Sequence, residues 1–461
     1  MKIALIRPNY HSHIVTPPLG LGYLLSALKN AGHEVIFIDG LNMKLSDEDI
    51  VERAKDCNLI GITVLSAFYV PAKRLTKQFK ELGKKVVLGG VHPTVMPVPT
   101  LRDTGADYIV MGEGEITIVE LVKAIENKED VNRVPGVVTL QNYDNYSVRD
   151  FISNLDDIAW PDWKVVDPRN YKEPHGAIIK NFPVAPVMTT RGCPYNCSFC
   201  VSPQFWQKKF RLRSPKNVVD EIEYLIKEFG VKEIHFEDDN LTLVRAHIEE
   251  ICNLVISRNL NISWATPNGI RADRVDEELL RLMKRAGCYY VVFGVESANE
   301  SILKTIDKKE SLDDIKKAIA TAKKVGLMTQ GFFIFGLPGE TEETIKNSLR
   351  FAKESKLSRA HFMLLDIVPG SRLWGEHKDE LSYDIENDDY LSYQEVTWIP
   401  PTITKDALKA WQGRAIRKFL FHPRSLYSLL KYFRLWQLEN VLSRLKDYRV
   451  LSFFDKNKKS K

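Results

Sequence analysis

Short β-branched runs alternate with helical stretches along most of this 461-residue chain, and this alternation restricts its fold more than any other feature. Repeats of strand, helix and strand build parallel sheets whose faces are covered by helices. Five runs near the start have strand character: Lys2–Arg7, Glu34–Asp39, Leu59–Thr63, Lys85–Gly90 and Tyr108–Met111. Four crossovers would join them. The pattern therefore predicts a small doubly wound, Rossmann-like α/β domain over residues 1–127.

A second series of strand and helix patterns follows residues 128–182, where prolines interrupt the periodicity and a linker with short strands is expected. Six further strands are predicted at Val187–Thr190, Glu233–Phe236, Asn261–Thr266, Tyr289–Gly294, Met328–Phe335 and Arg359–Ile367. Three glycines are expected to end helices between them: Gly230, Gly287 and Gly326. Six units are fewer than the eight of a closed barrel, so residues 183–370 are predicted to form a partial (β/α)6 barrel, open at one side.

Composition fits a protein of two or three globular domains, with 44% hydrophobic residues. No apolar run is long enough to cross a bilayer, and the first residues are too short a stretch for a signal peptide. Six cysteines in so long a chain do not make a disulfide framework. We therefore expect a cytoplasmic protein.

Three of the six cysteines, Cys193, Cys197 and Cys200, fall within eight residues after the first predicted barrel strand. Such crowding in a reducing compartment indicates a metal site. Four-iron clusters usually have four thiolates, so three leave one iron open to a substrate or cofactor. The alternatives are a zinc site completed by a histidine, or plain buried thiols. The other three cysteines are expected in the core: Cys57, Cys252 and Cys288.

This cysteine pattern resembles the signature of the radical S-adenosylmethionine (SAM) superfamily, C-x3-C-x-aromatic-C, in which Phe199 is the aromatic residue. The resemblance runs roughly from Val187 to Pro369. It implies a [4Fe–4S] cluster whose open iron is chelated by the amino and carboxylate groups of SAM. One electron then breaks a carbon–sulfur bond of SAM and gives a 5′-deoxyadenosyl radical. A reducing partner such as ferredoxin or flavodoxin is expected.

Later strand ends match the SAM-binding pattern of this family. Glu296 resembles the residue that holds the ribose hydroxyls, and Gly336 resembles the turn beside the adenine. Asp239 and Arg271 follow the second and third strands, where family members contact SAM or substrate. There are plainer alternatives: Asp239 could cap a helix, and Arg271 could pair with Asp273 at the surface.

The first block resembles the amino-terminal domain of cobalamin-binding radical SAM enzymes in three segments: residues 17–24, 88–94 and 112–115. The resemblance implies cobalamin at the carboxyl ends of the strands. Its contacts are predicted at six positions: Ser66, Gly89, Gly90, His92, Gly112 and Glu113. For His92 the alternative is a turn histidine hydrogen-bonded to backbone. No Asp-x-His-x-x-Gly motif is present, so the lower face of cobalt is expected to be weakly ligated or empty. No G-x-G-x-x-G follows the first strand, which argues against a dinucleotide.

The function implied by this domain pair is methylation of an unactivated carbon of a small-molecule or lipid-like substrate, with cobalamin carrying the methyl group. Cyclisation or rearrangement by the same cofactors is the alternative. Methylthiolation of RNA or protein would need a second three-cysteine cluster, and Cys57 stands alone in the first block. An iron–sulfur electron carrier or redox sensor would need four thiolates and no SAM pocket. No nucleic-acid partner is predicted.

The last part of the chain, residues 371–461, is predicted to be mostly helical and basic. From Thr404 to Lys461, fifteen Lys and Arg oppose four Asp and Glu, so this segment carries +11 although the whole chain carries only +5. Aromatic residues are interleaved with these cations. The pattern is typical of a helical lid that packs on the barrel, or of a surface that lies on an anionic membrane.

Overall fold

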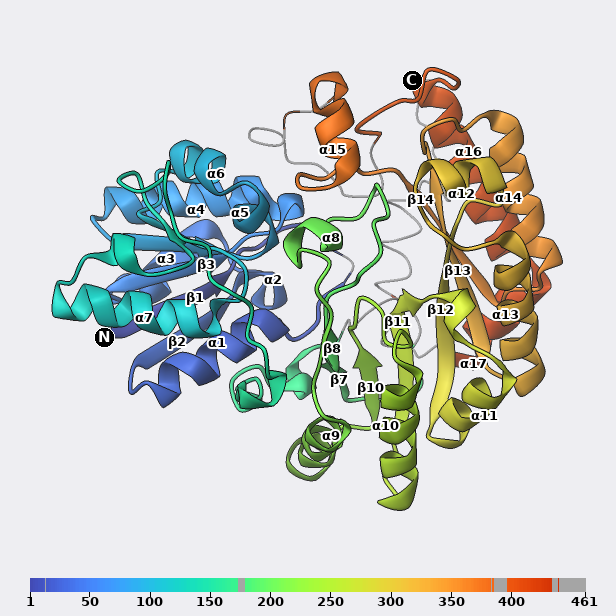
Figure 1. The fold of residues 1–461 in the computed structure, drawn as a ribbon, viewed down its shortest axis with the longest axis horizontal. Helices are drawn as coiled ribbons and strands as arrows, with labels where there is room; N and C mark the ends of the chain where they lie inside the picture. Colours follow the sequence, from blue (N-terminus) through green and yellow to red (C-terminus); the bar gives the residue numbers. More distant parts are fainter. Residues whose placement is uncertain (13, 173–178, 383, 385–395, 433–437, 439–461) are drawn as a thin grey trace, which may run out of the picture.

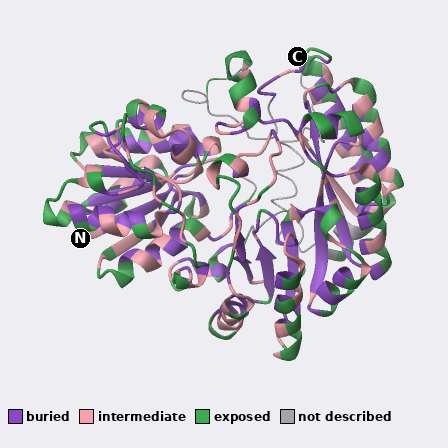
Figure 2. Cartoon of the chain, viewed as in Figure 1, coloured by how far each residue is buried: buried purple, intermediate pink, exposed green. Residues whose placement is uncertain are grey.

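Two α/β units lie side by side in the computed structural model, which describes all residues except 13, 173–178, 383, 385–395, 433–437 and 439–461 (Figure 1). The first unit occupies the left of the view and the second the right, and the short green helix α8 (Ser202–Phe205) lies between them. The strands of both units are largely buried, whereas the outer faces of their helices are exposed (Figure 2). Each unit is thus a helix-covered sheet, as the sequence predicts.

The first sheet has the strand order β2-β1-β3-β4-β5-β6 and is parallel except for β6. Its strands are β1 (Lys2–Arg7), β2 (Glu34–Asp39), β3 (Leu59–Thr63), β4 (Lys85–Gly89), β5 (Tyr108–Val110) and β6 (Val137–Val138). The order reverses between β1 and β3. Loops diverge at such a switch point and leave a crevice beyond the carboxyl ends of the strands.

Alternating side chains of β1 explain the helices on both faces of this sheet. Ile3 and Leu5 pack with one pair of helices, α1 (Leu19–Asn30) and α7 (Gly114–Asn127). Ala4 and Ile6 pack with the opposite layer, because successive side chains of a strand point to opposite faces. Helices of the opposite layer and the short helices near it are α2 (Gly40–Met43), α3 (Asp47–Ala54), α4 (Tyr69–Glu81), α5 (Val91–Val95) and α6 (Pro97–Thr104).

The second sheet has six parallel strands in the order β14-β13-β12-β11-β10-β7 and does not close. Its strands are β7 (Val184–Val187), β10 (Glu233–Phe236), β11 (Ser263–Ile270), β12 (Cys288–Glu296), β13 (Met328–Phe335) and β14 (Arg359–Leu364). The helices that follow them are α9 (Pro215–Phe229), α10 (Arg245–Ser257), α11 (Glu277–Arg285), α12 (Glu300–Thr305), α13 (Leu312–Val325) and α14 (Glu342–Glu354). The predicted partial (β/α)6 barrel is confirmed.

The first barrel strand lies three residues earlier than predicted, and its proline explains the error. Val184–Val187 contains Pro186, which argues against a strand interior in the sequence. β7 pairs only with β10 and is therefore an edge strand, where a residue without an N–H is tolerated. Thr190 and Arg191 instead form β8, a short antiparallel pair with β9 (Arg211–Leu212).

Residues expected to form a linker are part of both units. β6 extends the first sheet beyond residue 127. Trp163 is fully buried in a hydrophobic core that runs from β1 through α9 into the barrel, and its indole N–H donates to Glu221 at 2.9 Å. Gly22 of α1 lies so close to this segment that a Cβ there would stand 2.8 Å from Pro161. The two units therefore share one core.

Among the residues that the structure describes, three α-helices follow the barrel: α15 (Arg372–His377), α16 (Lys405–Leu420) and α17 (Pro423–Tyr432). Along α16, Leu408, Trp411 and Phe419 are buried, and Gln412 donates to the carbonyl of Phe362 in β14. This half of the basic segment packs on the barrel, as the lid hypothesis predicts. The residues after Tyr432, apart from Leu438, lie outside the described structure, and with them Phe433, Trp436, Tyr448, Phe453 and Phe454. No helix of the described residues has the length and apolar character needed to span a bilayer.

We predict that Trp163→Ala lowers the free energy of unfolding by about 3–5 kcal/mol, because it empties a filled site in the shared core. Leu140→Ala is the matched control, since Leu140 is exposed and its truncation should change stability by less than about 0.5 kcal/mol. Urea unfolding followed by circular dichroism measures both. Equal stabilities for the two variants would contradict a shared core.

Candidate functional site

A cavity of about 870 Å³ lies between the first sheet and the barrel. Five of the six predicted cobalamin contacts line it: Ser66, Gly89, Gly90, Gly112 and Glu113. They stand at the carboxyl ends of β3, β4 and β5, which is where a switch-point crevice is expected. The structure thus brings together residues that the sequence places up to 47 positions apart.

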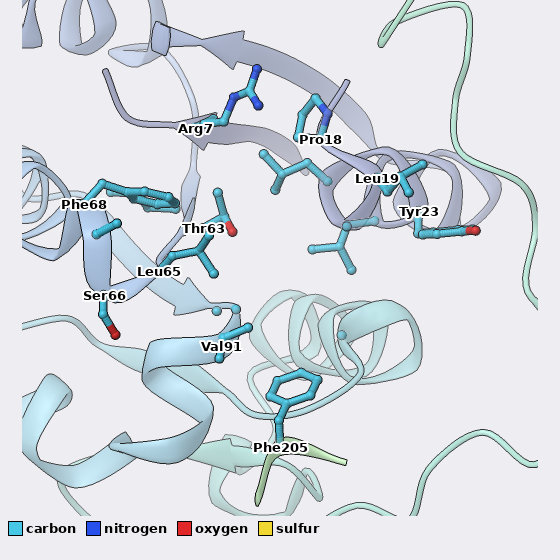
Figure 3. A pocket seen from close by; sticks show the side chains of 18 of the residues that line it. Arg7, Pro18, Leu19, Tyr23, Thr63, Leu65, Ser66, Phe68, Val91 and Phe205 are labelled. Atoms are coloured by element: carbon cyan, nitrogen blue, oxygen red, sulfur yellow. The ribbon is translucent and has the colours of Figure 1, made fainter. Parts of the chain in front are cut away.

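Apolar side chains form much of the wall (Figure 3). Leu19 and Tyr23 come from α1, whereas Leu65 and Phe68 follow β3. Phe205 reaches the cavity from the other unit, at the end of α8 (Ser202–Phe205). A flat, largely apolar ligand with polar groups at its rim would suit such a wall.

The turn after β4 lines the cavity and packs closely on the backbone after β3, because Gly90 has no side chain. Its φ is +106°, and a Cβ at this position would lie 2.8 Å from the carbonyl oxygen of Val64. Only glycine adopts this conformation without strain. The predicted role of the glycine pair, close backbone approach to a ligand, is compatible with this geometry.

His92, the sixth predicted contact, does not line the cavity. Its ring is buried against Tyr69, and its Nδ1 lies 2.9 Å from the hydroxyl of Ser66. Burial lowers the pKa of His92 to about 4, so the ring is neutral at pH 7. The structure places His92 where it orients Ser66, which does reach the cavity.

The cluster loop, which we define as residues 192–200, begins directly after β8 and is held tightly at its start. Gly192 has φ +97°, and a Cβ there would lie 2.0 Å from the carbonyl oxygen of Lys209. At its end, Ser198 N–H donates to the carbonyl of Ile306, and Leu373 N–H donates to the carbonyl of Ser198. The loop is therefore packed against the barrel and α15 rather than projecting into solvent.

Donor groups reach two of the three sulfur atoms, as thiolate ligands would require. Ser202 N–H donates to Cys200 Sγ at 3.4 Å, and the Asn240 amide lies 4.0 Å from Cys193 Sγ. Burial raises the pKa of all three thiols, that of Cys200 to about 12. A buried thiolate needs a positive partner, and iron would provide one.

The arrangement of the three cysteines is compatible with a cluster. Within the part of the chain that the structure describes, no three His, Cys, Asp or Glu side chains converge as ligands of one metal ion. Iron–sulfur clusters take separate thiolates on separate irons, so their cysteines need not converge. The other cysteines, Cys57, Cys252 and Cys288, are buried as predicted.

Glu296 lies at the end of β12 in a buried charged group. Its Oε1 is 3.1 Å from Lys308 Nζ, and Lys308 also lies 3.3 Å from Glu310. Burial raises the pKa of Glu296, and the charge of Lys308 opposes that rise. The φ of Glu296 is +60°, a conformation that non-glycine residues adopt mostly where function or packing demands it. Lys308 was not identified from the sequence, because nothing in its local pattern signals burial.

Arg271 pairs with Asp273, as the plainer alternative expected, but its side chain is buried and not at the surface. Its guanidinium donates to Asp273 at 2.9 Å and to the carbonyls of Lys308 and Lys309. It also lies over the ring of Tyr195, in the cluster loop, at 3.6 Å from the ring centroid. Arg271 therefore holds the cluster loop and the Lys308 segment together, and its contact with SAM stays a prediction.

The other predicted SAM residues lie near the same loop or at the next strand end. Asp239 accepts from Ser202 Oγ at 2.9 Å, and it does not cap α10, whose N-cap is Val244. Phe199 packs against the barrel core. Gly336 N–H donates to Glu340, and burial raises the pKa of that carboxyl to about 8. Glu340 thereby shapes the turn at Gly336.

Glu113 lines the cavity, but its carboxylate is bound by protein groups. It accepts from Arg191 at 2.6 Å, from Arg211 at 2.8 Å and from Ile152 N–H at 2.8 Å. Burial alone would raise the pKa of Glu113, yet the two arginines outweigh burial and hold it below its ordinary value. Sequence reasoning missed Arg191 and Arg211 as site residues, because they lie 78 and 98 positions from Glu113.

Comparison with known families identifies both units. Residues 187–352 match the model of the Radical SAM superfamily, and residues 11–122 match that of the B12 binding domain. An uncharacterized methyltransferase of Pyrococcus horikoshii is 34% identical over 92% of this chain and 94% of its own length. An anaerobic magnesium-protoporphyrin IX monomethyl ester cyclase of Rubrivivax gelatinosus is 32% identical over 88% of this chain and 74% of its own length.

The fold also matches a solved structure. The radical S-adenosylmethionine methyltransferase TsrM of Kitasatospora setae, with cobalamin and a [4Fe–4S] cluster bound, superposes with a TM-score of 0.68. The match covers 82% of this chain and 74% of that one at 21% sequence identity. The two proteins share an architecture in which both units are present.

We predict that His92 makes stability depend on pH. Its pKa is lowered from 6.5 to about 4 in the folded protein, so protonation of His92 favours the unfolded chain. The unfolding free energy is therefore unaffected by protonation of His92 above pH 6.5 and decreases as the pH falls from 6.5 towards 4. Relative to His92→Gln, the wild-type protein should lose about 2 kcal/mol of unfolding free energy between pH 7.5 and pH 5. Parallel pH profiles for the two proteins would show that His92 is not buried as a neutral ring.

Proposed function

The chain belongs to the radical SAM superfamily and carries a B12 binding domain, and from this premise we propose that it methylates an unactivated carbon of a small-molecule or lipid-like substrate. One observation carries the proposal. Val201, which directly follows Cys200, lines the same cavity as Gly89 and Gly90. A corrin at those glycines would thus lie beside the cluster loop, and both cofactors could act on one substrate.

In this proposal residues 1–127 bind cobalamin, residues 183–370 form the SAM-cleaving barrel, and residues 128–182 connect them. When bound, the cluster supplies the electron that cleaves SAM, and cobalamin supplies the methyl group. Cys193, Cys197 and Cys200 hold three irons and leave the fourth for SAM. Asn240 and the Ser202 N–H stabilise the sulfur charge by hydrogen bonding.

Further residues orient SAM in the proposal. Glu296 accepts hydrogen bonds from the ribose hydroxyls while Lys308 balances its charge. Gly336 leaves room beside the adenine. Asp239 is connected to the cysteine segment by its hydrogen bond with Ser202. Arg271 packs on the ring of Tyr195 and holds this part of the cluster loop in place.

Apolar side chains around the cavity exclude water from the reaction. Tyr23, Phe68 and Phe205 line it together with several leucines. A carbon radical reacts with whatever is near it, so a dry wall protects the intermediate. The Ser66 hydroxyl and the backbone at Gly112 provide polar groups among these apolar side chains.

Cyclisation or rearrangement is the second candidate, because a relative 32% identical is named as a magnesium-protoporphyrin IX monomethyl ester cyclase. Product mass separates the two reactions, since methylation adds one methylene unit and ring closure does not. The electron-carrier hypothesis has no comparable support, since the relatives in question are named as enzymes.

The cluster and the corrin should be separable by mutation. We predict that the Cys193→Ala/Cys197→Ala/Cys200→Ala chain loses iron and reductive formation of 5′-deoxyadenosine, yet retains corrin after gel filtration. Conversely, Gly89→Leu should fill the cavity, because a Cβ there meets nothing closer than 3.5 Å, and should lose corrin while keeping iron and SAM cleavage.

Cys57→Ala is the thiol control and should behave as wild type in both assays, because Cys57 lies in the core of the first unit. Formation of 5′-deoxyadenosine by the triple variant would refute the cluster assignment. Full corrin retention by Gly89→Leu would refute the cavity as the cobalamin site.

The proposal includes a reducing partner such as ferredoxin or flavodoxin. It also includes a cytoplasmic location, because the cluster needs a reducing compartment. The face beside the cluster loop offers a contact for an acidic carrier. Arg274 is exposed there and donates to the hydroxyl of Tyr195 at 2.7 Å.

Peripheral membrane contact through the basic tail is supported by α17. Tyr427 is 67% exposed and Leu430 is 77% exposed, and Phe421 just before the helix is exposed as well. Lys431 and Arg424 stand among them. Apolar side chains next to cations suit an interface with anionic lipids, and a lipid-like substrate would be met there.

We predict that the full chain cosediments with anionic vesicles but not with neutral ones, and that binding fades as salt is raised. Replacing Tyr427 and Leu430 by Ser should weaken binding severalfold, whereas Leu140→Ser, which removes an exposed leucine of the first unit, should not. Absence of binding to any vesicle would refute the membrane contact and leave α17 without this role.

A further inference from the structure

Four charged side chains bridge the two units, and three of them, Glu113, Glu115 and Arg191, line the cavity. Glu113 and Glu115 belong to the start of α7, whereas Arg191 and Arg211 belong to the β8–β9 pair that leads into the cluster loop. Arg191 donates through Nη1 to Glu113 and through Nη2 to Glu115, each at 2.6 Å. Arg211 donates to the other oxygen of Glu113 at 2.8 Å. We call these four residues the bridge.

The register of β8 and β9 makes the carboxylates necessary. Arg191 pairs with Arg211 across the antiparallel ladder, so two positive charges lie side by side. Like charges at opposed positions destabilise a strand pair. Both carboxylates of the bridge come from the first unit, and both arginines come from the second. The β8–β9 pair therefore depends on a domain that precedes it by many residues.

Burial makes this dependence strong. The side chains of Arg191 and Glu113 are 8% and 4% exposed. Breaking one partner of a buried ion pair leaves an uncompensated charge, which costs more than the pair itself contributes. Arg211 is further enclosed by the rings of Phe151 and Trp206, at 4.8 and 5.4 Å from their centroids.

The bridge stands between the two sites. Arg191 is separated from Cys193 only by Gly192, whose backbone is fixed against Lys209. Glu113 follows Gly112 at the end of β5, beside the proposed corrin contacts. A displacement of Glu113 is thus passed through one guanidinium to the first residues of the cluster loop.

We propose that Glu113 and Glu115 are positioning residues that order the cluster loop from the B12 domain, so that cluster and corrin are held at one fixed separation. Glu113 acts on the loop through Arg191 and Arg211 and not as a ligand of the corrin. This inference uses the cofactors of the proposed function but is independent of methyl transfer.

Hydrogen exchange of the anaerobic holoenzyme tests the inference without any assay of activity. In Glu113→Gln, peptides covering β8, β9 and the cluster loop should exchange about tenfold faster than in wild type, although the substitution lies in the other unit. Asp107→Asn is the matched control, because it breaks ion pairs to Lys80 and Lys85 within the first unit. It should leave β8 and β9 unchanged. Faster exchange confined to residues near Glu113 would overturn the proposal.

A second variant separates charge pairing from general damage. In Glu113→Gln/Arg211→Gln one charge of each sign is removed, while the contact of Arg191 with Glu115 stays. Exchange in β8 and β9 should return most of the way to wild type. If Glu113→Gln does not fold, Glu115→Gln replaces it and should affect β8 but not β9, since Arg211 keeps Glu113. A double variant no slower in exchange than the single one would overturn the pairing.

Spectroscopy reports on the separation itself. With cobalamin in its cobalt(II) state and the cluster reduced, each centre broadens the paramagnetic resonance of the other. Glu113→Gln should change this mutual broadening at unchanged iron and corrin content, and Asp107→Asn should not. Identical spectra for Glu113→Gln and wild type would contradict a fixed separation set by the bridge.

Discussion

Parallel strands end together, and this constraint underlies the rest of the structure. In each unit the functional loops follow the carboxyl ends of parallel strands, and the loops of both units line the cavity. The glycines after β4 and β5 thus lie near the loop that follows β8. Neither unit alone encloses this cavity, because the walls of the cavity come from both units.

Much of the fold was predictable because hydrophobic periodicity is local. β1, β2, β3, β10 and β13 have the predicted bounds, and Gly230 and Gly326 are left-handed helix caps as expected. Errors arose where tertiary context overrides the local pattern. Pro186 is acceptable only because β7 is an edge strand, and β6 is recognisable only once β5 offers a partner. Gly287, also predicted to end a helix, follows Ala286, the C-cap of α11, and has a positive φ.

The site was predictable in composition but not in its contacts. The spacing of the cysteines and the glycines at strand ends indicated which residues gather. The partners of Glu113, Glu296 and His92 were not visible, because each is paired with a residue whose sequence context is ordinary. Lys308 follows a helix among other lysines, and nothing local distinguishes its buried ammonium from theirs.

The shared core around Trp163 restricts how such proteins can exchange domains in evolution. Pro161 lies against α1 and Trp163 packs on α9, so the first unit cannot be exchanged as a cassette cut at residue 127. A graft from another protein would have to bring its own connecting segment and a matching α9 surface. New substrates are more easily acquired by altering loops around the cavity, and the two halves should be inherited as a pair.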